Sequence, residues 1–316
     1  MVKKSRIRRR ARTVFKGSKT KTRSISKNLQ KSFVIEFQCA KISPETFIKR
    51  TRTYQDSGYY PFWILGGNQL KRQFHNAYRL SSFQWLFSTN LTSVLKQSPQ
   101  IISFCPQNKT FIFLKNIKAI SATLSLTTPT ILSINQCSFE DFYQPYKEHL
   151  QIDTWLHTKR LWRTPRPHLS HSQHFLRKLY LKRGQPLWLF PSEAGVPICC
   201  HYFIETPTYI WQSWLLEIFV TNKKEGEKFH ITLVKRAFKT LVNKGVFKLR
   251  ILPLFDSMSF YLAIEHYLKF LCHIQVLTTM DYEVFIKNQE VSHQKTLEQA
   301  YTKDQQVIRH YIEFNY

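Results

Sequence analysis

The first 31 residues contain no Asp or Glu, although they hold thirteen of the 47 Lys and Arg residues of the chain. Because like charges repel and little apolar surface is available to bury, we expect residues 1–31 to form a basic, flexible tail. Such a tail is either an arm that contacts DNA or a segment without evolved structure. The remainder is also basic, with 34 Lys and Arg against 20 Asp and Glu. Basic side chains displace the counterions condensed on nucleic acids, and aromatic rings, which make up 15% of the chain, can stack on bases. The composition therefore favours a nucleic-acid partner over a merely basic protein.

Several common signatures are absent, and each absence argues against a class of protein. No CxxC pair occurs among the six Cys residues, so no zinc site or thioredoxin-like site is indicated, and their scatter favours reduced thiols in a cytoplasmic protein. The most apolar stretches, 209–220 and 258–272, are too short or too interrupted by charge to span a membrane. A P-loop, a dinucleotide-binding fingerprint and a nucleophile elbow are also missing, which argues against ATP-driven and serine-hydrolase functions.

An apolar, β-prone run at 33–39 predicts a strand. Ser43 and Pro44 then form a helix start signal, with Ser as the N-cap and Pro at the first helical position. Gly58 supplies the stop, and 59–65 predicts a second strand. Because a strand, a short helix and a strand in this order form a βαβ unit, we expect two parallel, buried strands.

The rest of the chain is expected to be a hairpin followed by helices. A helix is predicted from Ser81 or Ser82 to Leu95, and two β-prone runs around a turn predict a hairpin over 101–114. Beyond about residue 140 the apolar periodicity becomes mostly helical. The helices expected there cover 138–151, 170–182, 208–221, 229–243, 256–273 and 295–312.

The most informative short motif is Glu36-Phe37-Gln38. On a strand, alternate residues share a face, so Glu36 and Gln38 should point together. A carboxylate on an apolar strand is costly to bury unless it is paired or binds a cation. An E-x-Q pair ahead of a helix is typical of restriction-type nucleases, in which the Glu ligates Mg²⁺ and the third residue positions the attacking water. The alternative is a Glu at a strand edge that accepts hydrogen bonds from backbone donors.

The run from Val34 to Leu70 resembles the nuclease-like core of the CoiA family of competence proteins. Members of that family read as an E-F-Q-C strand, an I-S helix with R-T and a Tyr, and a strand ending near W-I-L-G. The resemblance implies a cytoplasmic protein of bacterial natural transformation that acts on internalised single-stranded DNA. It also implies a partial restriction-endonuclease-like α/β core followed by a mainly α-helical C-terminal region. The matching positions are Glu36, Gln38, Cys39, Ile42, Ser43, Arg50, Thr51, Tyr54, Gly58, Trp63 and Gly66.

Two departures from this family pattern concern the metal. The Cys-rich, zinc-binding-like module of the family is missing, so we expect no zinc. A restriction-type centre also needs an acid on the strand before the E-x-Q strand, and no Asp or Glu precedes Glu36. We expect that strand just upstream of Glu36, joined to the E-x-Q strand by a short hairpin. The N-terminus then either starts inside the ancestral domain or was replaced by unrelated basic sequence. Glu36 and Gln38 are therefore candidates for a degenerate catalytic site, with Glu36 as its one metal ligand and Mg²⁺ not productively bound.

Further candidates would bind DNA rather than cut it. Arg50, Arg52 and Tyr54 lie on the helix after the E-x-Q strand, and positions 50 and 54 share a face. Arg50 would contact a phosphate near Glu36, or alternatively form a structural pair with Glu36 while Tyr54 joins the core. In the tail, the candidates are Arg8, Arg9 and Arg10.

Two clusters of metal-type ligands favour structural roles. His168, His171 and His174 stand at spacing three, but nearby Pro residues and the lack of a fourth ligand favour exposed or capping side chains. Vicinal Cys199 and Cys200 sit in an apolar run and are expected in the core.

We divide the chain into the tail (1–31), a nuclease-like α/β domain (32–125) and a mainly helical C-terminal domain (126–316). Three functions are consistent with it. The first is a competence-related DNA-processing or DNA-binding protein with an incomplete nuclease centre. The second is a structural module that recruits recombination proteins, and the third is an active Mg²⁺-dependent nuclease. Salt-dependent DNA binding separates the first from the second, and the missing acid argues against the third.

Overall fold

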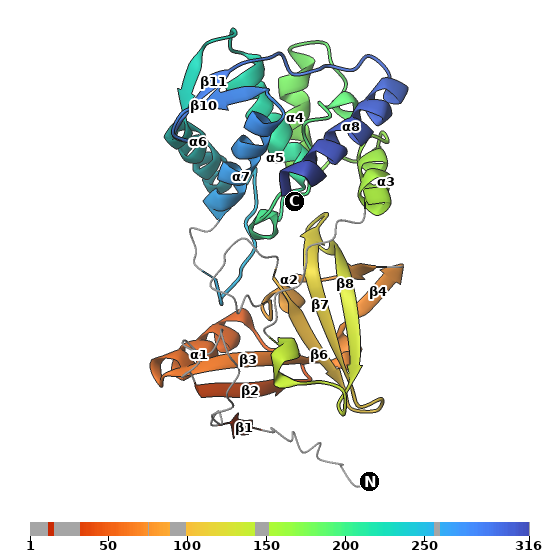
Figure 1. Ribbon diagram of the computed structural model, residues 1–316, viewed down its shortest axis with the longest axis vertical. Coiled ribbons are helices and arrows are strands. Elements are labelled where there is room, and N and C mark those ends of the chain that lie inside the picture. Colours follow the sequence, from red (N-terminus) through yellow and green to blue (C-terminus); the bar gives the residue numbers. More distant parts are fainter. Residues whose placement is uncertain are drawn as a thin grey trace.

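The computed structural model describes residues 12–15, 32–74, 76–88, 99–142, 152–255 and 260–315 (Figure 1). A mixed sheet with helices at its edge and face forms an N-terminal α/β half, and a mainly helical half follows it along the long axis of the molecule (Figure 1). No helix in these described ranges is long and apolar enough to cross a membrane.

The predicted βαβ unit is present and opens the α/β half. Strand β2 (Ser32–Gln38) leads into helix α1 (Pro44–Asp56), and β3 (Tyr59–Gly66) then pairs with β2 in parallel. The Ser43 hydroxyl accepts a 3.2 Å hydrogen bond from the Thr46 amide, as expected of an N-cap. Sequence reasoning was accurate here because every boundary carries a local chemical signal.

Eight strands form the sheet, in the order β1-β2-β3-β6-β7-β8-β5-β4. The predicted hairpin is confirmed, because β6 and β7 pair antiparallel with Ile101 opposite Leu114. Strands β2, β3 and β6 run parallel, and all other neighbours run antiparallel. The remaining elements of this half are β1 (Arg12–Phe15), β4 (Lys71–Phe74), β5 (Ala77–Arg79), helix α2 (Ser82–Trp85), β6 (Ile101–Cys105), β7 (Thr110–Ala119) and β8 (Leu124–Ser133).

Three expectations for this half need correction. Strand β1 lies inside the range expected to be a tail, and its connection to β2 covers 16–31, longer than a short hairpin. The sheet extends past residue 125, because β8 pairs with β7 as far as Ser133. Helix α2 ends at Trp85, because the Phe87 and Ser88 amides donate to carbonyls three residues back and tighten the chain into turns. The rest of the expected helix, 89–95, falls outside the described residues.

Most helices predicted for the C-terminal half are present. Expectation and structure agree for α4 (His171–Leu181), α6 (Ile231–Asn243), α7 (Phe260–His273) and α8 (Leu297–Asn315). Helix α5 (Thr208–Leu215) continues as a π-helical segment, η6 (Leu216–Thr221).

Other elements of the C-terminal half were not predicted. Of the expected helix 138–151, the start forms a 3₁₀ turn, η3 (Phe139–Phe142), in which the Asp141 carboxylate accepts from the Ser138 amide at 2.7 Å, and 143–151 lie outside the described residues. Helix α3 (Ile152–Trp162) was not foreseen. A small antiparallel sheet also joins β9, β10 and β11, in which β10 and β11 are neighbours along the chain and β9 is distant in sequence. Its strands are Lys228–His230, Leu277–Thr279 and Val284–Lys287.

Arg250 joins the two halves. Its guanidinium donates to the carbonyls of Tyr202 (2.6 Å) and Ile204 (3.2 Å) in the C-terminal half and to that of Ser121 (3.2 Å) after β7. The same guanidinium lies 4.2 Å from the ring centre of Trp85 at the end of α2. One buried side chain therefore holds the sheet, α2 and the C-terminal half together.

Candidate nuclease-like site

The face of β2 that meets α1 carries the two polar residues of the E-x-Q motif. Glu36 is 3% exposed and Gln38 is 8% exposed, whereas Phe37 between them points to the opposite face and is 37% exposed. The strand lies inside the sheet, with β1 on one side and β3 on the other. Glu36 is therefore a buried carboxylate on an interior strand, and burial at such a position requires a partner.

Helix α1 supplies the partners of both residues. Arg50 forms an ion pair with one carboxylate oxygen of Glu36, and the Tyr54 hydroxyl donates to the other. A second nitrogen of Arg50, Nη1, donates to Gln38 Oε1 at 3.2 Å, while Gln38 Nε2 donates to the Ala40 carbonyl at 2.5 Å. Each carboxylate oxygen of Glu36, and both polar atoms of the Gln38 amide, thus have a partner from the protein.

Aromatic packing fixes α1 over the strand. The Arg50 guanidinium lies 4.9 Å from the ring centre of Trp63 on β3, and Trp63 Nε1 donates to the Thr51 hydroxyl at 3.1 Å. Phe47, fully buried one turn earlier, packs on the same Trp63 ring with 4.4 Å between ring centres. These contacts hold α1 against β3 and keep the Arg50 guanidinium over the Trp63 ring.

On the other side of β2, the register pairs Arg12 of β1 with Glu36. The strand before the E-x-Q strand has the sequence Arg-Thr-Val-Phe and so contains no acid, whereas a restriction-type centre carries one on this strand. Mg²⁺ prefers several oxygen ligands, and Arg cannot be one of them. Within the described ranges no three His, Cys, Asp or Glu side chains gather as a metal site. Glu36 is the one acid in the sequences of β1 and β2.

The other predicted site residues are not part of this cluster. Arg52 is exposed on α1 and does not share the face of Arg50 and Tyr54. Arg8, Arg9 and Arg10 lie outside the described residues. His168, His171 and His174 are exposed around the start of α4, and Cys199 and Cys200 are buried, with their sulfur atoms 3.3 Å apart.

A second buried polar cluster, in the C-terminal half, was missed by the sequence reasoning. Asp304 on α8 accepts from Arg163 through both carboxylate oxygens at 2.8 Å and contacts Lys159 Nζ at 2.9 Å. Arg163 also donates to the carbonyls of Trp188 and Phe190, so it braces the loop after α4. Lys159 and Arg163 are spaced four apart on α3 and its end, which is the only local signal. The distant Asp304 could not be assigned to them from sequence.

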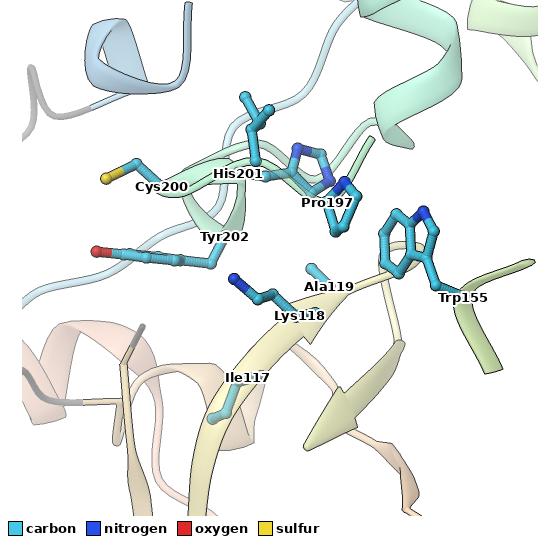
Figure 2. A pocket seen from close by; sticks show the side chains of 9 residues that line it. Ile117, Lys118, Ala119, Trp155, Pro197, Cys200, His201 and Tyr202 are labelled. Atoms are coloured by element: carbon cyan, nitrogen blue, oxygen red, sulfur yellow. The ribbon is translucent and has the colours of Figure 1, made fainter. Parts of the chain in front are cut away.

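A small cavity lies at the seam between the two halves (Figure 2). Lys118 of β7 extends into it toward Tyr202 and His201, and Trp155 closes another side (Figure 2). None of its lining residues is an acid. Burial, together with the nearby charges of Arg250 and Lys118, holds the pKa of His201 well below its usual value. His201 is therefore neutral at pH 7, and its Nδ1 accepts from Trp211 Nε1 at 3.3 Å.

Comparison with known proteins places a domain boundary between the α/β half and the mainly helical half. Residues 20–147 match the family model described as "Competence protein CoiA, nuclease-like domain", and 150–312 match "Competence protein CoiA, C-terminal domain". Competence protein CoiA of Bacillus subtilis (strain 168) is 29% identical over 262 residues, which cover 81% of this chain and 67% of the relative. No solved structure matches the chain.

The α/β half thus matches the nuclease-like domain of the family, and the half that follows matches the C-terminal domain of the same family. The chain belongs to the competence protein CoiA family, because the two family models together cover nearly all of it. Membership supports a competence-related role for the protein.

Proposed function

We propose that this chain binds internalised single-stranded DNA during natural transformation, in the cytoplasm, and does not cut it. The observation that carries the proposal is that the Glu36 carboxylate is already engaged by side chains of the protein. Both of its oxygens accept from α1 side chains, and Arg12 stands opposite it on β1. A carboxylate held in this way stabilises the strand–helix contact instead of offering oxygens to a cation.

We also propose that the α/β half descends from a restriction-endonuclease-like fold. Its support is the order β1, β2, α1, β3, with the E-x-Q pair on β2 next to an antiparallel strand and followed by a parallel one.

Charge supports the DNA-binding part of the proposal. The net formal charge is +27, and 34 of the basic residues lie outside the first 31. Each phosphate neutralised on a single strand contributes about −0.7 to the slope of log affinity against log salt. Binding should therefore be tight at low salt, weak at high salt and nearly independent of sequence.

The test is fluorescence anisotropy of a labelled oligo-dT across a salt series. The triple variant Arg8→Gln, Arg9→Gln, Arg10→Gln keeps strand β1 and should reduce the magnitude of the slope by about 2 if those residues contact phosphates. An unchanged slope shows that the basic segment is not an arm. Absence of salt-dependent binding by the unaltered protein overturns the proposed function.

A further inference from the structure

Basic charge is distributed unevenly along the C-terminal half. The segment 154–192 holds eight Lys and Arg residues and no Asp or Glu, whereas 193–316 holds fourteen basic and thirteen acidic residues. The positive charge of this half therefore comes almost entirely from α3, α4 and the loops next to them. An acid-free stretch of this length favours an anionic partner over a merely solvated surface.

Three of the eight basic residues are already used by the fold. Lys159 and Arg163 are buried against Asp304, and Arg183 Nε contacts a Glu217 oxygen at 2.6 Å. The other five are exposed, and none forms an ion pair with an acid in the part of the chain that the structure describes. They are Arg160, Arg166, Arg177, Lys178 and Lys182.

Helix α4 displays three of these five side chains together. Its inner face, with Ser172, Leu176 and Tyr180, is buried. Arg177 and Lys178 are exposed on the last turns, and Lys182 is exposed at the C-cap. Basic side chains at a helix C-terminus are favoured by the helix dipole, so the cluster costs little in the folded protein.

An exposed aromatic side chain lies next to this helix. The short helix η4 (Leu187–Leu189) packs on α4, and its Trp188 ring is 39% exposed. The Trp188 carbonyl accepts from Arg163 Nη1 at 3.1 Å, so the backbone that carries the ring is anchored to the buried cluster. A partly exposed indole on an element that packs on α4 offers a stacking surface for a base, and the exposed cations of α4 offer sites for phosphates.

We propose that Arg177, Lys178, Lys182 and Trp188, here called the α4 surface, bind single-stranded DNA. This inference rests on the proposed function and assigns it a second contact region. The partner is a single strand because only unpaired bases expose their faces to an indole. In Figure 1, α4 lies at the end of the molecule opposite β1, so contacts at the α4 surface and contacts near the N-terminus would be separate.

A charge-reversal experiment with a matched control tests the proposal in the full chain. The test variant is Arg177→Glu, Lys178→Glu, Lys182→Glu. The control is Arg236→Glu, Lys239→Glu, Lys244→Glu on α6, which places two exposed changes on a helix and one at its C-cap with the same change in net charge. Anisotropy with labelled oligo-dT over a salt series reads affinity and slope, and circular dichroism confirms that both variants are folded.

The α4 variant should lower the magnitude of the slope by about 2 and lower the affinity at least tenfold more than the α6 control. Trp188→Ala should weaken binding several-fold with an unchanged slope, and Trp188→Phe should recover most of the loss because a smaller ring still stacks. If the α4 and α6 variants lose equal affinity for DNA, the effect comes from net charge alone. That result overturns the proposed role of the α4 surface and leaves the proposed function intact. Tighter binding of duplex DNA, or of an acidic protein, than of oligo-dT overturns the choice of partner. Absence of DNA binding by the unaltered protein overturns both proposals.

Discussion

Arg50 is the residue on which the candidate site depends, because it pairs with a carboxylate that is only 3% exposed. Replacing Arg50 with Met keeps a flexible, unbranched side chain at this position but leaves Glu36 buried without its cation. Breaking a buried ion pair in this way should lower the free energy of unfolding by about 3–5 kcal/mol. The double variant Glu36→Gln, Arg50→Met should recover most of the loss, because neither charge remains.

Urea denaturation measures these differences, and Arg52→Met is the control on the exposed face of the same helix. The control should change stability by less than about 0.5 kcal/mol. An Arg50→Met variant as stable as the control would show that the pair is not structural, and Glu36 would again be a candidate metal ligand.

Asp304 is expected to make the stability of the fold depend on pH. Burial acts to raise the pKa of this carboxyl, but Lys159 and Arg163 outweigh burial and hold the pKa below its usual value. A carboxylate with a lowered pKa in the folded state stabilises the fold above its unfolded pKa of about 3.9, and that stabilisation is lost as pH falls through the folded value. Chemical denaturation from pH 6 to pH 3 should show stability falling below about pH 4.

The Asp304→Asn variant tests the origin of that fall. It should be less stable at pH 6 by about 3–5 kcal/mol, because two cations stay buried without an anion, and its stability should depend less on pH below 4. An identical pH profile in the variant and the unaltered protein would assign the acid sensitivity to other carboxyls.

At the scale of elements, sequence reasoning succeeded where boundaries have local signals. Ser43 and Gly58 bracket α1, and turn residues separate β6 from β7, so both units follow from nearby chemistry. It failed where an element depends on distant partners. Strand β9 is three residues long and pairs with β11, which lies far along the chain, while β10 and β11 are themselves only three and four residues long.

The same limit applies to the candidate site. Alternation along β2 and the spacing of Arg50 and Tyr54 were readable from sequence, and the structure brings all four predicted residues together. Whether Arg50 would face a phosphate or the Glu36 carboxylate was not readable, because that depends on how closely α1 packs on Trp63. The pairing of Arg12 with Glu36 likewise follows from register, which residues 1–31 alone do not specify.

Arg250 is the element-scale link between the halves. An Arg250→Leu variant leaves the carbonyls of Ser121, Tyr202 and Ile204 without this donor, at about 1–3 kcal/mol for each that stays buried and unpaired. We expect the thermal transition to drop and to split in two, because the shared contact between the halves is lost. Differential scanning calorimetry measures this, with exposed Arg236→Leu as the control. A single transition at the unaltered temperature would show that other seam contacts suffice.

At the scale of the whole molecule, a basic chain carries a nuclease-like domain whose one buried acid on β2 is held by an Arg and a Tyr. Membership of the CoiA family and this geometry are consistent with each other, because a nuclease-like domain need not be an active nuclease. On our account the fold has kept its shape and its affinity for DNA, and the position opposite Glu36 no longer provides a metal ligand.

Cleavage of labelled single-stranded and double-stranded DNA in the presence of Mg²⁺ or Mn²⁺ tests this central claim most directly, comparing the unaltered protein with Glu36→Ala and Glu36→Gln. We predict binding to the single strand without cleavage above the background of a mock preparation, in all three proteins. Because Glu36→Gln keeps an acceptor for Arg50 and Tyr54, it separates loss of the carboxylate from loss of the fold. Robust metal-dependent cleavage by the unaltered protein that disappears in both Glu36 variants would contradict the account.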